Sequence, residues 1–277
     1  MTDLTMTRLH EVMVVIYAIS LVFYFIDYLR KNQKLYRFAF WGVSIVWIMQ
    51  SLFLVLYIVQ THRFPILTIF EGIYFYAWLL IAISIAMHCI FKLDLPVILM
   101  NIIAFCLIVI HTFAPAQMDA TPLGDNLISE LLMFHVVFAI LSYGGFAIVF
   151  VFAMLYIFLY SLLKRKKWQP NQFARLPSLS QTEQGMIYAL YAGVPLLGIS
   201  LILGMMWAYV ALGNFPLADV KIIGSLISML IYSCIIYKNR KGKLYGTKFA
   251  WATIYAFLIV LINFFLGSRF SAFHFWY

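Results

Sequence analysis

The chain has 277 residues, of which 65% are hydrophobic and only 10% are charged, and its formal net charge at pH 7 is +9. With a mean hydropathy of +0.97, this composition excludes a soluble globular domain. A helix needs about 20 apolar residues to cross a hydrocarbon core about 30 Å thick, so the chain is long enough for roughly eight spans. The composition therefore indicates a polytopic membrane protein.

The apolar runs are long and unbroken, and they lack the alternation of barrel strands. Backbone amides in lipid need hydrogen bonds within their own segment, so these runs predict helices. Charged residues and clusters of Pro, Asn and Asp mark where the runs end. We expect an all-α bundle of eight transmembrane helices that forms a single domain over residues 1–277. The expected helices cover residues 9–29, 38–60, 66–91, 97–113, 131–163, 186–213, 220–237 and 249–267.

The cations are distributed unequally between the two sets of connecting loops. Fifteen of the 19 Lys and Arg residues fall in one set, which includes the loops 164–185 and 238–248. Lys and Arg are retained on the cytoplasmic side, so we expect these loops in the cytoplasm and both termini and the loop 114–130 outside a bacterial plasma membrane. The net charge then reflects insertion and contact with anionic membrane lipid, and it predicts no nucleic-acid partner. The other four cations are Arg8, Arg63, Lys221 and Arg269.

Several functional classes lack their motifs in this chain. There is no nucleotide-binding glycine loop, no His-Glu-x-x-His zinc motif and no plausible Ser/His/Asp set, so we expect no enzyme activity. The three cysteines show no Cys-x-x-Cys spacing, which argues against covalent haem attachment. A transporter is disfavoured because the helices lack paired charges at mid-membrane and no inverted repeat is visible.

Histidine is the remaining residue with ligand chemistry, because an imidazole is costly inside a membrane without a partner, a ligand or water. His88 is expected near the inner surface, and the other five histidines near the outer one. Imidazoles ligate haem iron, aromatic walls hold its macrocycle and cations pair with its propionates. Aromatic residues and the cations Arg63, Lys221 and Arg269 also lie on the outer side, although an interfacial aromatic belt has the same composition. The outer histidines are His10, His62, His111, His135 and His274, and the outer aromatic residues are Trp207, Phe215, Phe270, Phe273, Phe275 and Trp276.

Glu71 is an acidic residue near the expected outer end of the third helix. A carboxylate at this depth must face water, a cation or the bundle interior. One interpretation is a structural pair with Arg63. The other is a role at a surface that contacts haem propionates or admits protons.

The stretch GMMWAYVALGNFPLAD resembles the tryptophan-rich motif of the cytochrome c assembly proteins of the CcsA, ResC and CcmC type. That motif runs Gly-x-x-Trp-Ala, four residues, then Gly-x-x-Trp-x-Trp-Asp-Pro-Lys. Pro216 and Ala218 replace its two central tryptophans, and Val220 replaces its proline. The residues that match the motif without a gap are Gly204, Trp207, Ala208, Gly213, Asp219 and Lys221.

Other segments are similar to the same family. FHVVFAILSYGG resembles the helix start that carries an external haem-ligating histidine in the family, and the matching position here is His135. FPILTIFEGIYFYAW resembles the family segment NxYESLxFLxW. NFFLGSRFSAFHFWY resembles the end of the last family helix, which carries the second external histidine. His274 is the nearest candidate for that histidine, although it lies about three residues after the family position. His88 lies about one turn from the position of the internal histidine of the family.

The resemblance implies that haem is the cofactor and that His135 and His274 ligate its iron, with His111 as the next choice for the second ligand. It also implies haem-binding roles for Trp207, Asp219 and Lys221 near these outer ligands, and for His88 at the separate internal position. The loss of two tryptophans implies weaker haem binding than in a full assembly protein.

The overall pattern resembles a Gram-positive branch of the family that is encoded with haem-biosynthesis enzymes. That likeness implies a haem-handling membrane protein that restrains the amount of glutamyl-tRNA reductase. The expected partners are haem, membrane lipid, and either that reductase or other proteins of haem biosynthesis or cytochrome c maturation. Two alternatives stay open: a regulatory adaptor that works without haem, and a haem exporter or cytochrome c maturation component.

Overall fold

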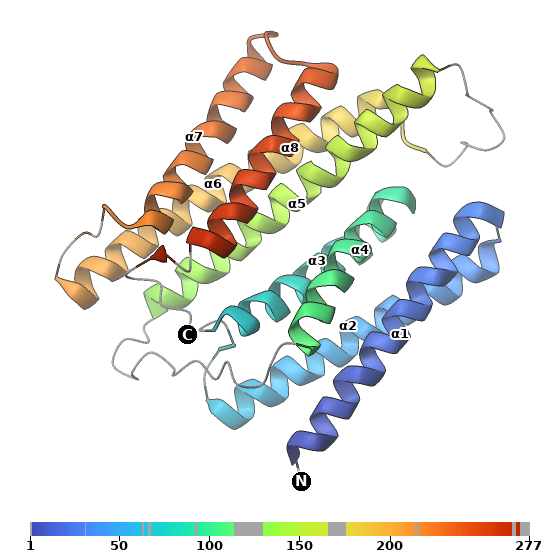
Figure 1. Ribbon diagram of the computed structural model, residues 1–277, viewed down its shortest axis with the longest axis horizontal. Coiled ribbons are helices and arrows are strands. Elements are labelled where there is room, and N and C mark those ends of the chain that lie inside the picture. The colour runs from blue at the N-terminus through green and yellow to red at the C-terminus, as the bar shows by residue number, and fades with distance from the viewer. Residues whose placement is uncertain are drawn as a thin grey trace. The chain divides into compact units, whose positions relative to one another are not determined.

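The computed structural model of the chain (Figure 1) is entirely helical over the residues that it describes. The chain divides into two compact units, Met1–Ala120 and Thr121–Tyr277, called here the N-terminal unit and the C-terminal unit. The expectation of one assembly-like domain over the whole chain stays a prediction. The described residues are 2–30, 32–62, 64–65, 68–91, 94–113, 130–165, 176–213, 215, 217–267 and 270–271.

Four helices make up the described part of the N-terminal unit. Helix α1 packs against α2 and α4, and α3 packs against α2 and α4. Polar groups join the helices within this core: the Tyr17 hydroxyl donates to the side-chain oxygen of Asn101 at 2.8 Å, and the Asn101 amide donates to Ser84 Oγ at 2.9 Å. The helices are α1 (Thr2–Arg30), α2 (Gln33–Thr61), α3 (Ile69–Phe91) and α4 (Asp94–Thr112).

The described residues of the C-terminal unit form four further helices and a short π-helix. Helix α5 packs along α6 and also contacts α8, while α7 contacts α6 and α8. Figure 1 shows α5 and α6 running side by side along this unit. Ser142 Oγ donates to the Gly193 carbonyl at 2.8 Å, and such small interfacial residues allow membrane helices to approach closely. The elements are α5 (Glu130–Lys164), α6 (Leu179–Leu212), α7 (Val220–Arg240), α8 (Gly246–Ile262) and the π-helix η2 (Asn263–Gly267).

Eight helices in the described part of the chain are long and apolar enough to cross a membrane, which confirms the eight predicted helices. Two helix starts differ from the prediction by seven residues: α1 begins at Thr2 and not at 9, and α6 begins at Leu179 and not at 186. Its start is a capping box: Ser178 Oγ accepts from the Gln181 amide at 3.1 Å, and the Gln181 side chain accepts from the Ser178 amide at 2.8 Å. The connection expected over 164–185 is therefore shorter, because residues 179–185 belong to the start of α6.

Candidate functional site

His135 lies near the start of α5 and faces α6. Its Nδ1 is 2.7 Å from the Ser200 carbonyl oxygen, and Ser200 Oγ donates in return to the His135 carbonyl at 2.8 Å. With Nδ1–H donating to that carbonyl, Nε2 carries the lone pair of the ring. A backbone carbonyl that accepts from the other ring nitrogen and fixes the tautomer in this way is the usual arrangement for a histidine that ligates a metal. We call the end of the C-terminal unit where α5 begins and α6 ends the His135 end.

The first half of the tryptophan-rich motif packs against this histidine. A Cβ atom at Gly204 would lie 2.6 Å from His135 Nδ1, so the imidazole rests directly on the backbone of α6. Trp207 and Ala208 follow at helical spacings of three and four residues and are 6% and 0% exposed. The face of α6 that carries these motif residues is therefore the packing surface that positions His135. The Trp207 side chain is mostly buried in this packing.

The chain turns back where α6 ends. Gly213 adopts a left-handed conformation (φ 70°), and its amide donates to the Tyr209 carbonyl at 3.0 Å, as in a helix cap that favours glycine. Phe215 then stacks on Tyr209 with ring centroids 4.8 Å apart, and both rings are about half exposed. The sequence did not indicate Tyr209, because its stacking on Phe215 depends on this reversal of the backbone. Ala218 lies exposed in the following turn, and Pro216 is outside the described residues.

Asp219 connects the start of α7 to the C-terminal segment. One carboxylate oxygen caps α7 by accepting from the amides of Lys221 (3.0 Å) and Ile222 (3.3 Å). The other accepts from Ser271 Oγ at 2.6 Å. Asp219 and Ser271 are 9% and 3% exposed, so this bond is shielded from water. Sequence analysis did not find Ser271, because nothing in the sequence indicates a contact across 52 residues.

Lys221 brings a cation to the same place. Its side chain is partly buried in the C-terminal unit and interacts electrostatically with both Asp219 and His135. The structure thus brings together three of the predicted site residues, an imidazole, a carboxylate and an ammonium, at the His135 end. His274, the predicted second iron ligand, lies outside the described residues, as do Arg269, Phe273, Phe275 and Trp276.

His88, the remaining predicted site residue, belongs to the N-terminal unit. The Tyr36 hydroxyl is 2.5 Å from its Nδ1, and its ring lies 4.6 Å from that of Phe40. These partners come from α2, whereas His88 lies near the end of α3. The described contacts of His88 are thus those of a histidine held between two helices.

Glu71 has partners other than Arg63, which is outside the described residues. Its carboxylate accepts a hydrogen bond from the Tyr57 hydroxyl and another from the Thr68 amide at 3.1 Å. Thr68 Oγ1 in turn accepts from the Glu71 amide at 3.1 Å, which completes a capping box at the start of α3. These contacts support a structural role for Glu71.

Residues 66–274 match the model of the family described as Cytochrome C assembly protein. The chain belongs to the cytochrome c assembly protein family, and the resemblance noted in the sequence is confirmed. It is 43% identical over 275 residues to protein HemX of Bacillus subtilis (strain 168), with 99% of each chain covered. It is 37% identical over 270 residues to protein HemX of Brevibacillus brevis, covering 97% of this chain and 98% of the relative. A more distant relative is the cytochrome c biogenesis protein CcsA of Chlamydomonas reinhardtii, 28% identical over 210 residues, with 73% of this chain and 57% of the relative covered.

Proposed function

We propose that this protein binds haem reversibly at the His135 end and handles it within the bacterial plasma membrane. The observation that carries the proposal is the carbonyl-held imidazole of His135, packed on the first glycine of the family's tryptophan-rich motif. In this tautomer the lone pair on Nε2 suits an axial iron ligand. Bound haem would supply an iron centre and two propionates, and membership of a cytochrome c assembly family supports haem as the ligand.

The second proposed iron ligand is His274. It follows Ser271 by three residues, Ser271 is fixed to Asp219, and three residues of extended chain reach at most about 10 Å. Lys221 interacts electrostatically with His135 from the same region. An imidazole from the C-terminal segment is therefore within reach of the proposed haem site.

The remaining site residues have distinct proposed roles. Lys221 pairs with a haem propionate, Asp219 orients the start of α7, and Trp207 supports the helix face beneath His135. The stacked pair of Tyr209 and Phe215 offers an exposed aromatic wall near the positions where the family carries tryptophans. His88 is proposed to contact a separate inner haem.

The protein is proposed to be a haem sensor and not an enzyme. Two indoles of the motif are absent, and an aromatic pair is worth roughly 0.5–1.5 kcal/mol beyond its area burial. Binding would then be weaker than in a full assembly protein, which suits reversible occupancy better than haem transfer to an apocytochrome.

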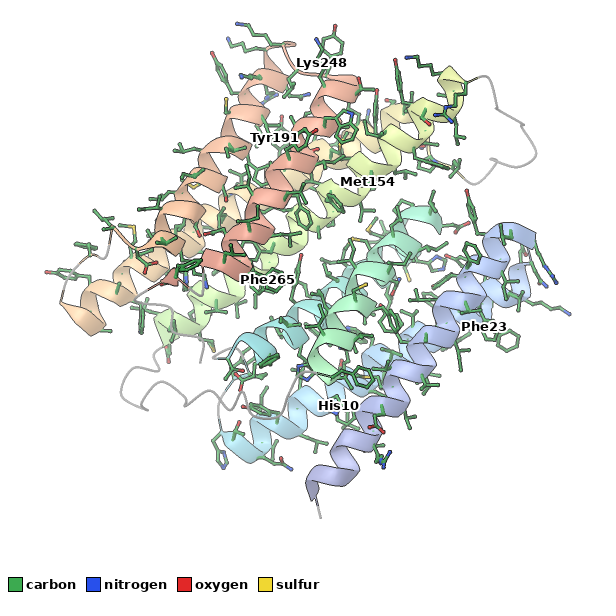
Figure 2. All side chains as sticks on the ribbon, in the orientation of Figure 1. His10, Phe23, Met154, Tyr191, Lys248 and Phe265 are labelled. Carbon is green, nitrogen blue, oxygen red and sulfur yellow. The ribbon has the colours of Figure 1, made fainter. Side chains whose placement is uncertain are left out.

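The proposed topology places both termini and residues 114–130 outside, and residues 164–178 and 238–248 in the cytoplasm. It rests on the fifteen-to-four division of cations. Figure 2 labels Lys248 at the start of α8, directly after the described basic turn between α7 and α8. We propose that these cytoplasmic surfaces act on a soluble partner, glutamyl-tRNA reductase, and restrain its amount.

A second candidate function is a regulatory adaptor that works without haem. The observation in its favour is the missing aromatic platform, since Ala218 is small and exposed where the family motif has an indole. A third is a haem exporter or cytochrome c maturation component, which the similarity to proteins named for cytochrome c biogenesis favours.

The test of the proposed function is an absorption spectrum of detergent-purified full-length protein, with and without added haem. We expect a low-spin signal from one haem at the His135 end of each chain, and we expect this signal to be lost in His135→Ala. A parent protein that takes up no haem, or a His135→Ala variant with the parental spectrum, would contradict the proposal. The adaptor is favoured if His135→Ala and His274→Ala leave the cellular amount of glutamyl-tRNA reductase unchanged.

A further inference from the structure

Four rings from four different helices meet in the N-terminal unit. His10 of α1 stacks on Phe53 of α2 with centroids 4.4 Å apart, and Tyr74 of α3 lies 4.7 Å from His111 of α4. The two imidazole centroids are 6.0 Å apart, and Tyr74 lies 5.8 Å from His10. Figure 2 labels His10 near the start of α1. We call the end of this unit where α1 begins and α4 ends the His10 end.

The His111 ring is held in one orientation by its backbone partner. Its Nδ1 lies 3.1 Å from the Phe70 carbonyl oxygen, so Nδ1–H donates to the carbonyl and Nε2 keeps a lone pair. A ligating histidine usually donates its other N–H to a carbonyl or carboxylate in this way. His10 is oriented differently, by its near-parallel stacking on Phe53, with 18° between the ring planes.

The Tyr74 ring, which contacts both imidazoles, carries a buried hydroxyl without a hydrogen-bond partner among the described residues. The Tyr74 side chain is 5% exposed, and its OH neither donates to nor accepts from another described group. The hydroxyl of Thr112, next to His111 in the chain, is in the same situation. An unsatisfied buried hydroxyl costs roughly 1–3 kcal/mol and indicates an additional partner, such as water or an ion.

We propose that His10 and His111 bind one transition-metal ion of the class that prefers imidazole nitrogen, such as Zn²⁺ or Cu²⁺. An ion 2.0–2.1 Å from one nitrogen of each ring would separate the ring centroids by roughly 4.5–6.5 Å, and the observed separation is 6.0 Å. Within the described residues, no group of three His, Cys, Asp or Glu side chains is placed to hold a metal. The remaining coordination positions therefore fall to water and to the Tyr74 oxygen.

The geometry favours a single ion over a second haem at this place. Tyr74 contacts both imidazoles, so its ring fills space that a macrocycle between them would need. The two histidines also lie at the ends of candidate spans, at Arg8–Arg30 and Asp94–Thr112, where an ion can arrive from water. This site lies wholly in the N-terminal unit and is independent of the proposed haem site.

The test uses full-length protein in detergent, with its affinity tag removed and metal stripped by a chelator, titrated with Co²⁺ as a spectroscopic substitute for Zn²⁺. We expect about one Co²⁺ per chain, with visible bands of nitrogen ligation. His10→Ala and His111→Gln should each weaken binding by at least about tenfold, since loss of even an outer-shell partner costs 10–100-fold. The Gln side chain keeps a polar group of similar length in place of the imidazole, which limits the loss of packing at this position.

The matched control is His62→Asn, at the C-cap of α2 in the same unit. His62 is exposed and has a left-handed backbone (φ 53°) that Asn tolerates. This variant and His135→Ala should both keep Co²⁺ binding. We expect that result whether or not the parent protein binds haem, so the metal proposal and the haem proposal are tested separately. The proposal is overturned if the parent shows no nitrogen-ligated Co²⁺, or if His62→Asn loses as much binding as His10→Ala and His111→Gln.

Discussion

Ser271 donates a buried 2.6 Å hydrogen bond to Asp219, the residue that caps α7. The bond joins the last described residue of the chain to the carboxylate of the tryptophan-rich motif. One side chain therefore both starts a helix and holds the segment that leads to His274. The same carboxylate interacts electrostatically with Lys221, so a change at Ser271 should reach the proposed haem site through Asp219.

Ser271→Ala should loosen the second proposed haem ligand without removing the first. We expect part of the bound haem to change from a six-coordinate low-spin to a five-coordinate high-spin spectrum, because the bond that fixes Ser271, three residues before the proposed ligand His274, is lost. Ser228→Ala is the control, since Ser228 Oγ bonds only to the Gly224 carbonyl of its own helix in the described structure. A parental spin state in Ser271→Ala would show that the tether does not position the ligand.

Gly204→Ala should displace the His135 imidazole. The added methyl would lie 2.6 Å from Nδ1, and overpacking of this kind costs about 1–3 kcal/mol. We expect a lower thermal transition and weaker haem uptake. Gly198→Ala in the same helix is the matched control, because the nearest atom to a Cβ added there is Met229 Sδ at 3.8 Å. Equal behaviour of the two variants would argue against a close contact with His135.

His135→Ala and His274→Ala should each abolish or shift the low-spin haem spectrum, because six-coordinate iron needs both axial ligands. His135→Ala should have the larger effect, since the Ser200 carbonyl fixes that ring in the orientation required. Titration of purified variants with haem measures both. Two single variants with the parental spectrum would place the haem site elsewhere.

Tryptophan at positions 216 and 218 should strengthen haem binding. Two restored aromatic contacts are worth roughly ten- to a hundredfold in affinity. Ala218 is exposed in its turn, so an indole there displaces no core side chain. Haem occupancy after purification is the measurement. Unchanged occupancy, or stoichiometric haem in the parent protein, would contradict a weak sensor.

Single cysteines at Lys166 and Ala120 should be labelled from opposite sides of the membrane. The expectation follows from the cation distribution. Cys89, Cys106 and Cys234 are exposed on the helix surfaces and must be replaced first. Labelling of both positions from the same side would contradict the proposed topology.

The helices could be predicted because lipid imposes a strong hydropathy pattern on the sequence. Their ends were predicted less well, since the capping box of Ser178 and Gln181 consists of polar residues that also suit a loop. The spacing of Thr68 and Glu71 is also that of a capping box, so this helix start could have been predicted from the sequence. The presence of this capping box gives Glu71 a structural role that the sequence had left open.

The candidate site was predicted where a local motif carried it and missed where distant segments meet. His135 and Gly204 are 69 positions apart, yet both were found because each lies in a stretch with family character. Ser271 has no such signal, and its bond to Asp219 depends on where α8 and η2 end. Tyr209 was missed because its stacking on Phe215 arises from the backbone reversal at Gly213, which is a property of conformation and not of composition.

The lengths of α5 and α6 limit how this protein can lie in a bilayer. They contain 35 and 34 residues, so each is about 50 Å long at 1.5 Å per residue. Confining such a helix to a hydrocarbon core of about 30 Å would need a tilt of roughly 55°, outside the observed range of about 0–40°. The ends of this helix pair must therefore stand among the lipid head groups or in water. Glu183, whose carboxylate accepts from the Gly246 amide at 3.2 Å, then joins α6 to the start of α8 at a level that a water-soluble protein can touch.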